Sequence, residues 1–269
     1  MLKMFLALFL TPFLLQATDF IQWQKPQMKA QGGHAQHGGH GGAQKFEIGG
    51  FDADATYEVR YITSTLEALA LEPKNGIVTP PRTGLNNYHA LVVNEKCGDV
   101  FSSSVRYIYG HGKPSKTSPT KLTHLQKSEL EIVPSPLPRE HDRYTASKSY
   151  DFLLRFKGKP LQNIPIILNT QNGSELHATS GKKGTFAITL PNDFKAVKED
   201  RGANKPAEFF LKAAYTSEGM QYATTLAMPY HVNPNDYWRS EPLGALLIVV
   251  GMIAGWFIMR RYVHNKRKA

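Results

Sequence analysis

The chain has 269 residues, with 32 lysine and arginine residues against 22 acidic ones and a formal net charge of +10 at pH 7. Such an excess is typical of nucleic-acid-binding proteins, but six of the basic residues lie in the two terminal segments described below. The remaining chain has 26 basic against 22 acidic residues, so nucleic acid is not expected as a partner. Cys97 is the single cysteine, which excludes an internal disulfide.

The N-terminus has the pattern of a secretory signal peptide. Lys3 gives a short positive region, residues 4–15 are apolar, and Leu-Gln-Ala at 15–17 is a plausible cleavage site. We therefore expect residues 1–17 to be a signal peptide that is removed on export. The alternative is an uncleaved anchor, which would give a protein with two membrane spans.

Residues 18–44 are expected to form a flexible segment, because they are rich in glycine and poor in apolar residues. This segment contains His34, His37 and His40, spaced three residues apart. Imidazole suits nickel, copper and zinc, and glycine lets the chain wrap around an ion. The tract therefore predicts a site for a divalent transition-metal ion. The alternative is a flexible linker without a metal role.

Residues 45–130 are predicted to form a β-rich domain. Runs of β-branched and aromatic residues, separated by turn-forming residues, predict strands at 46–51, 57–62, 88–94 and 101–109. Residues 63–71 fit either a short helix or a strand. His89, inside a predicted strand, and His111, just after another, are further candidate metal ligands, although a single histidine in such a position is more often a packed or capping residue than a ligand.

Residues 131–143 are rich in proline and are expected to form a strand end followed by a connection to a second domain at residues 144–232. Turn signals recur there every eight to twelve residues, a spacing typical of a β-sandwich. The expected strands are 150–156, 164–169, 175–179, 185–190, 209–215 and 221–230. The predicted fold class is mainly β, with two Ig-like or transthyretin-like β-sandwich units and one C-terminal transmembrane helix.

The apolar run Leu243–Met259 predicts that helix, because it contains no charged residue and nearly matches a hydrocarbon core of about 30 Å. Residues 260–269 contain five basic residues and no acid. Basic residues beside a span stay in the cytoplasm, so the tail is expected there and the domains on the other side. In a bacterium this arrangement corresponds to an inner-membrane protein with periplasmic domains.

A resemblance to a known family comes from several segments. The segments are LEIVPSPLP, FLLRFKGKPLQNIPIIL, a glycine-rich turn into TFAITLP, FFLKAAYTSEGMQYATTLAMPYHV and, in the first unit, YHALVV with VRYIYGHGKPS. Together they resemble bacterial periplasmic β-sandwich domains associated with nickel and cobalt uptake, over residues 45–232. The resemblance implies an exported binding or accessory domain in metal handling. That family often places a histidine ligand near the mature N-terminus, where this chain has Thr18 and Asp19.

The predicted function is that of a membrane-anchored periplasmic binding or accessory protein for nickel or cobalt, alternatively copper or zinc, acting beside a membrane transport complex. His34, His37 and His40 would capture the ion, together with His89 or His111. The alternative is a metal-free structural or protein-interaction module of the cell envelope.

An enzyme is not expected, because the sequence has no G-x-S-x-G, H-E-x-x-H, P-loop or C-x-x-C motif. One catalytic alternative stays open. His89, Asp99 and a serine among residues 102–104 could assemble into a triad, since chain order does not constrain such a site.

Overall fold

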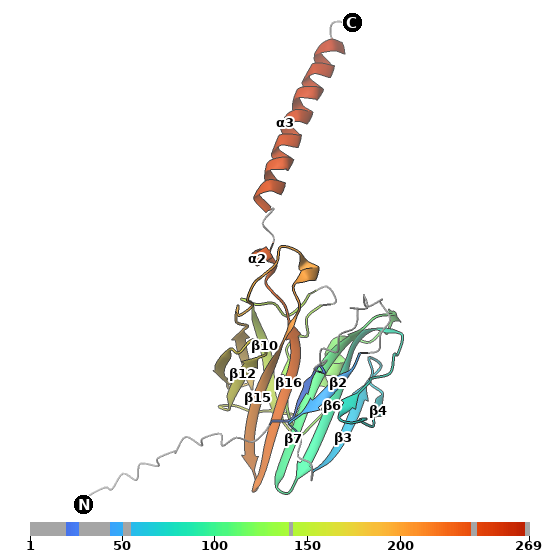
Figure 1. Cartoon of the computed structure of the whole chain (residues 1–269), viewed down its shortest axis with the longest axis vertical. Helices are drawn as coiled ribbons and strands as arrows, with labels where there is room; N and C mark the ends of the chain where they lie inside the picture. The colour runs from blue at the N-terminus through green and yellow to red at the C-terminus, as the bar shows by residue number, and fades with distance from the viewer. Residues whose placement is uncertain (1–19, 27–43, 51–54, 140–141, 238–240, 267–269) are drawn as a thin grey trace, which may run out of the picture.

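The computed structural model describes residues 20–26, 44–50, 55–139, 142–237 and 241–266. The expected signal peptide, the three histidines of the glycine-rich tract and the last three residues of the basic tail lie outside the described residues. The chain forms a β-sheet body from which one long helix, α3, extends (Figure 1). The helices are α1 (Pro119–His124), the 3-10 helix η1 (Arg201–Ala203), α2 (Pro234–Tyr237) and α3 (Glu241–Lys266).

The largest sheet has nine strands and includes strands from both expected units. Its order is β13-β12-β15-β16-β7-β6-β3-β4, and β8 pairs with β6. These strands are β3 (Thr56–Ile62), β4 (Ala68–Ala70), β6 (Leu85–Cys97), β7 (Val100–Gly110), β8 (Lys113–Pro114), β12 (Pro165–Thr170), β13 (Glu175–Thr179), β15 (Ala207–Ser217) and β16 (Met220–Tyr230). The segment 63–71, left open between helix and strand, therefore contains a strand.

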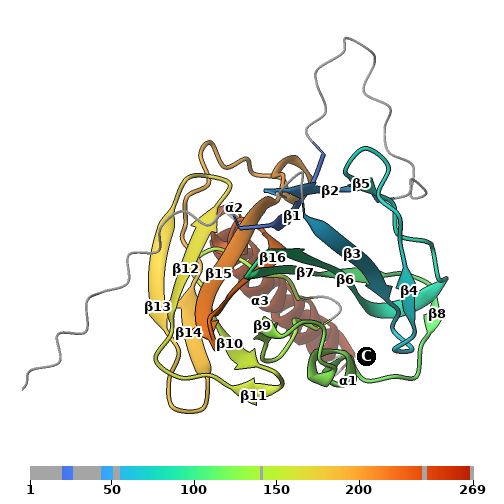
Figure 2. The ribbon, with the colours of Figure 1, turned by 90° about the horizontal axis from the view of Figure 1, so that it is seen from below.

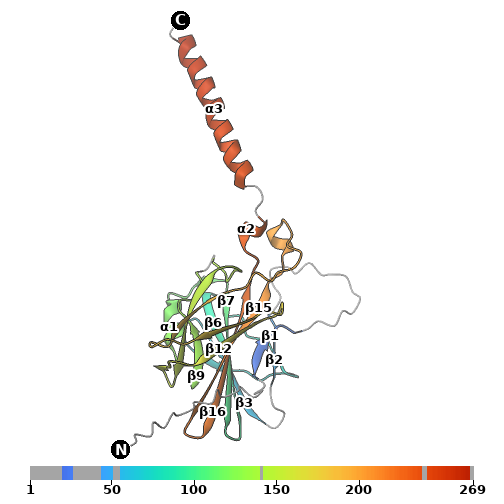
Figure 3. The same ribbon diagram turned by 90° about the vertical axis from the view of Figure 1, so that its left-hand side faces the viewer.

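Two smaller sheets cover the faces of the large one. A three-stranded sheet has the order β1-β2-β5, and a four-stranded sheet has the order β11-β10-β14 with β9 also paired to β10. Figures 2 and 3 show β1 and β2 on one side of the large sheet and β9 with α1 on the other. The strands are β1 (Gln22–Gln24), β2 (Phe46–Gly49), β5 (Ile77–Val78), β9 (Leu130–Pro134), β10 (Ser149–Phe156), β11 (Lys159–Pro160) and β14 (Thr185–Thr189).

Strand β6 shows why the large sheet needs cover on both faces. Successive side chains of a strand point to opposite faces, and this strand carries an almost uninterrupted apolar run. Tyr88, Ala90 and Val92 belong to the core shared with the four-stranded sheet. Leu91 and Val93 belong to a second core beneath the three-stranded sheet. The body is therefore a β-sandwich with an additional layer.

The expectation that residues 18–44 are unfolded is wrong for the start of this segment. Residues 22–24 form β1, which pairs with β2. Trp23 is fully buried, and its indole Nε1 donates a hydrogen bond to the backbone oxygen of Ser104 at 3.1 Å. Ile21 and Trp23 are two residues apart and enter the same core, so their burial offsets the cost of ordering the segment.

The two expected sandwich units share the large sheet. β16 of the second unit pairs in parallel with β7 of the first, from Gln221 opposite Val100 to Leu226 opposite Val105. A buried, bidentate ion pair joins Arg106 of β7 to Glu208 of β15, with nitrogen–oxygen distances of 2.6 and 3.0 Å. The expected connection at 131–143 also begins inside β9, which pairs with β10.

Helix α3 differs from the helices of a packed core. Its segment Leu243–Arg261, 19 residues, is long and apolar enough to cross a membrane, and none of it is buried against the body. Each large apolar side chain from Leu243 to Met259 is at least 47% exposed. So large an unbroken apolar surface is compatible with a single-pass membrane anchor.

Candidate functional site

The predicted metal ligands are not brought together in the part of the chain that the structure describes. His34, His37 and His40 fall outside it. His89 lies inside β6, whereas His111 follows β7, is exposed, and packs edge-on against Tyr109 with ring centroids 5.3 Å apart. Among the described residues no group of three or more His, Cys, Asp or Glu side chains could hold a metal ion.

His89 is a buried histidine with both ring nitrogens engaged. The Ser64 backbone N–H donates to Nδ1 at 3.0 Å, and Nε2 lies 3.3 Å from the Thr83 hydroxyl. Because Nδ1 accepts a hydrogen bond, the neutral ring carries its proton on Nε2, and the one in-plane lone pair, on Nδ1, is already engaged and not free for a metal. The ring also stacks on Tyr61, and burial lowers the His89 pKa below its usual value. These contacts fit a structural role.

The possible triad does not assemble. In the β6–β7 register, His89 lies opposite Ile108 and Ser104 lies opposite Val93. Four residues of strand separate the two positions, which amounts to about 13 Å at about 3.3 Å per residue. Ser103 is also buried, where its hydroxyl contacts the backbone oxygen of Leu130 and the Thr224 hydroxyl, each at 3.0 Å.

A cavity of about 630 Å³ lies between α1, the ends of β6 and β7, and the proline-rich segment that follows β9. Its size is typical of a ligand pocket. We call it the α1–β9 pocket. Apolar and aromatic side chains make up much of its wall: Tyr88, Tyr109, Pro114, Pro119, Val133, Pro134, Pro136, Leu137, Pro138 and Leu153. The peptide bond before Pro136 is cis.

The polar part of the α1–β9 pocket is cationic. Lys116, Arg139 and Arg155 line it together with His124, and the described residues of its lining include no aspartate or glutamate. Lys116 and Arg139 are exposed, and the structure gives them no ion pair within the described residues. The pocket therefore combines an aromatic and proline surface with positive charge, which favours a ligand that has apolar groups and a carboxylate.

Local hydrogen bonds hold the wall formed by α1. Asn87 of β6 donates from Nδ2 to the Ser115 hydroxyl at 2.8 Å and to the Thr117 backbone oxygen at 2.6 Å. The next residue, Ser118, caps the helix by accepting from the Thr120 N–H, and proline follows at the first helical position. The loop before α1 is thus tied to the large sheet.

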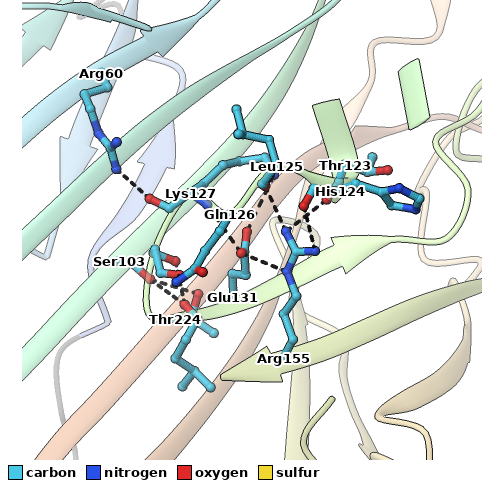
Figure 4. Close-up of polar contacts among 12 residues, drawn as sticks. Arg60, Ser103, Thr123, His124, Leu125, Gln126, Lys127, Glu131, Arg155 and Thr224 are labelled. Atoms are coloured by element: carbon cyan, nitrogen blue, oxygen red, sulfur yellow. Dashed lines mark hydrogen bonds and ion pairs between the residues drawn. The ribbon is translucent and has the colours of Figure 1, made fainter. Parts of the chain in front are cut away.

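The other end of α1 is held by a buried ionic cluster of Lys127, Glu131 and Arg155 (Figure 4). Arg155 donates from Nε to Glu131 Oε1 at 2.9 Å, and its two terminal nitrogens donate to the backbone oxygens of Thr123, His124 and Leu125 at 2.8–3.2 Å. Carbonyl groups at a helix C-terminus lack partners within the helix. Arg155 donates the missing hydrogen bonds to these carbonyl groups and so holds the pocket wall formed by α1 in place.

Lys127 is the most unusual member of the cluster, because its side chain is fully buried. Its Nζ donates to the Leu125 backbone oxygen at 2.6 Å and lies 3.6 Å from Glu131 Oε2. It also lies 5.5 Å from the centre of the Tyr107 ring. Burial lowers the pKa of Lys127 from 10.5 to about 8; the Glu131 carboxylate opposes this shift and Arg155 adds to it. Near neutral pH the cluster is therefore one acid between two cations.

Sequence reasoning did not single out these three residues. A partial signal was present, because Glu131 and Arg155 are direct cross-strand partners in the β9–β10 ladder. Opposite charges at facing positions of antiparallel strands stabilise each other. Recognising this pair requires the strand pairing, however, which the sequence alone does not give. Lys127 lies in the loop between α1 and β9 and carries no sequence pattern of its own.

No family model and no curated protein matches the chain. Solved structures with some likeness include a calcium-stabilised adhesin with which an Antarctic bacterium binds ice (12% identity, TM-score 0.26), a Salmonella alpha-2-macroglobulin variant (11%, 0.27) and the D0–D1 domain of intimin (12%, 0.24). The matches cover 70–71% of this chain. The chain spans 43% of the adhesin, 13% of the macroglobulin and 90% of the intimin fragment. TM-scores this low carry no functional argument.

Proposed function

We propose that this chain is a membrane-anchored binding module, with its β-sheet body in the periplasm and its basic C-terminus in the cytoplasm. The observation that carries the proposal is the fully exposed apolar segment of α3, joined to a body whose large sheet is covered on both faces. The basic residues that begin the tail, Arg260 and Arg261, support the orientation, because such residues stay on the cytoplasmic side.

The anchoring test compares the full chain with a chain that ends at residue 240. We expect the full chain to stay in the membrane pellet after alkaline carbonate extraction and the shortened chain to be released. In spheroplasts, external protease should digest the body and spare an epitope placed after residue 269. Carbonate release of the full chain, or digestion of the epitope without digestion of the body, would contradict the proposal.

The α1–β9 pocket is the ligand site in this proposal, and its chemistry favours an acidic segment of an envelope protein. Lys116 and Arg139 would pair with carboxylates, while Tyr88 and Tyr109 would pack against apolar side chains of the same segment. Charge steers such encounters and aromatic contacts supply much of the binding energy. This corresponds to a protein-interaction module of the envelope.

Site-specific photo-cross-linking tests the pocket. A cross-linking residue at position 116 should capture a discrete partner in intact membranes, whereas the same residue at Lys182, an exposed lysine in the turn after β13, should not. The double variant Lys116→Glu/Arg139→Glu, with the cross-linker at Tyr109, should lose the product. Equal capture from positions 116 and 182, or capture unaffected by charge reversal, would exclude this pocket as the site.

A second candidate function is capture of a divalent transition-metal ion, and the H-x-x-H-x-x-H spacing of His34, His37 and His40 favours it. The ion would be nickel, cobalt, copper or zinc, passed on to a membrane transport complex. Because His89 has no free ring nitrogen, the tract would act without it, and exposed His111 is the ligand that the body could add.

Calorimetric titration of the full chain in detergent with each of the four ions tests this function. Stoichiometric binding at pH 7.5 should weaken below about pH 6.5, where imidazole is protonated. The triple variant His34→Ala/His37→Ala/His40→Ala should lose it, whereas His177→Ala, an exposed histidine on β13, should not. Unchanged binding in the triple variant would contradict metal capture by the tract.

A further inference from the structure

A second cavity, of about 200 Å³, lies at the end of the body from which α3 departs. Its lining combines the segment after β16, the segment before β10 and the loop that contains η1; Tyr237, at the end of α2, closes one side. Figure 1 shows α2 and the η1 loop at the end of the body nearest α3. We call it the membrane-proximal pocket.

The distance from this pocket to the apolar segment is limited by the chain itself. Leu243, where the apolar segment begins, comes six positions after Tyr237, which lines the pocket. Even a fully extended chain covers at most about 3.6 Å per residue, so the two points lie within about 22 Å of each other. If α3 spans a membrane, as proposed above, the pocket lies close to the lipid headgroups.

The pocket is strongly cationic. Arg143, Lys148 and Arg201 line it with His231, and Asp142 is the one carboxylate among the described residues of the lining. The three cationic side chains are exposed, and none has an ion pair among the described residues. Three cations from two separate parts of the chain therefore converge on one small cavity, with a single acid among its described lining residues.

The pKa of His231, which lines the pocket, is lowered in part by the same positive charges. Burial, followed by the charges of Arg143, Lys25 and Arg201, lowers its pKa to about 4. The imidazole is therefore neutral at physiological pH. Its position is fixed by the chain, because the His231 N–H donates to the Tyr144 backbone oxygen at 2.9 Å and Ala146 N–H donates to the oxygen of His231 at 2.8 Å.

We infer that the membrane-proximal pocket binds the phosphate group of an anionic phospholipid headgroup in the leaflet that α3 enters. Arginine guanidinium groups match phosphate oxygens in a bidentate way, and lysine adds a point charge. The cavity has room for a phosphate with part of the attached headgroup. Occupation would hold the body against the membrane in one orientation. The inference rests on the proposed anchoring.

The test uses the full chain reconstituted into nanodiscs of phosphatidylcholine alone or with 30 mol% phosphatidylglycerol. Hydrogen–deuterium exchange is measured for peptides that cover residues 142–148, 200–204 and 231–237. We expect exchange in these peptides to slow about five-fold or more with phosphatidylglycerol, because each basic residue near an anionic surface contributes about that factor in binding. Inorganic phosphate added to the phosphatidylcholine discs should not reproduce the effect.

A matched pair of variants gives the control. Arg143→Gln/Lys148→Gln/Arg201→Gln should abolish the lipid-dependent protection. Lys159→Gln/Lys182→Gln/Lys183→Gln removes the same charge from exposed lysines. Lys159 pairs with Phe156, the last residue of β10, which lies about 23 Å from the start of that strand at about 3.3 Å per residue. This control should keep the protection.

Each failure has its own signature. Equal protection in both lipid mixtures, or equal loss in both triple variants, would overturn the headgroup site. Protection by inorganic phosphate but not by phosphatidylglycerol would overturn the lipid as the ligand in favour of a soluble phosphate. A chain that does not enter the discs at all would instead contradict the anchoring on which the inference rests.

Discussion

Lys127 is a buried cation, and its charge can be detected through the pH dependence of the stability of the folded chain. Its pKa of about 8 in the folded chain lies below its ordinary value of 10.5. Between these pH values the unfolded chain keeps a proton that the folded chain has lost, so the unfolded state binds more protons and stability rises with pH. The difference is worth about 3 kcal/mol at about 1.4 kcal/mol per pKa unit.

The variant Lys127→Met should lose this pH dependence. Between pH 8 and pH 10.5 we expect the free energy of unfolding of the parent to rise by up to about 3 kcal/mol more than that of the variant. Urea titrations at both pH values measure it. Lys121→Met, at an exposed position of α1, is the control and should track the parent. A parent and a Lys127→Met variant with parallel pH profiles would show that the ammonium is not held in a desolvated site.

His231 predicts a pH effect in the acid range. Its folded-state pKa of about 4 lies below the ordinary 6.5, so between these values the unfolded chain binds a proton that the folded chain does not. Its contribution to stability is therefore complete above pH 6.5 and is lost as the pH falls toward 4. When the pH is lowered from 7 to 5, the melting temperature of the variant His231→Asn should fall less than that of the parent. Differential scanning calorimetry measures this, and equal losses would contradict it.

At the scale of the elements, the short strand β1 contributes to stability through one buried side chain. Trp23 is fully buried in the core beneath the three-stranded sheet. Truncating such a side chain costs about 3–5 kcal/mol. We expect Trp23→Ala to destabilise the body by this amount in urea titrations, and Trp256→Ala, on exposed α3, to leave the stability of the body unchanged. Equal effects of the two variants would mean that β1 does not dock on the sheet.

Strands with a strong local pattern were predictable from the sequence, and those that depend on partners were not. The prediction for 101–109 matches β7 and that for 150–156 matches β10. Each of these segments either alternates polar and apolar residues or is dense in β-branched and aromatic residues. β1 is only three residues long and adjoins a glycine-rich tract, so composition pointed to disorder. The ionic cluster and both pockets depend on segments distant in sequence, which no local pattern encodes.

At the scale of the whole molecule, the parallel β7–β16 pairing makes the body one sheet system instead of two. Each expected unit by itself would expose a long strand edge and part of a shared core. We therefore expect the body to unfold in one cooperative transition, measured by calorimetry. Fragments 45–130 and 144–232, expressed separately, should give poorly dispersed NMR spectra. Two separate transitions, or two well-folded fragments, would contradict this.

The position of β16 also decides how the protein responds to tension. This strand leads through α2 directly toward α3, and it lies between β15 and β7 near the middle of the large sheet. A pull on the anchor acts along β16 and shears all of its ladder hydrogen bonds at once, whereas an edge strand could be peeled away one bond at a time. The chain thus joins its long apolar helix to a strand that is paired along both edges and resists shear.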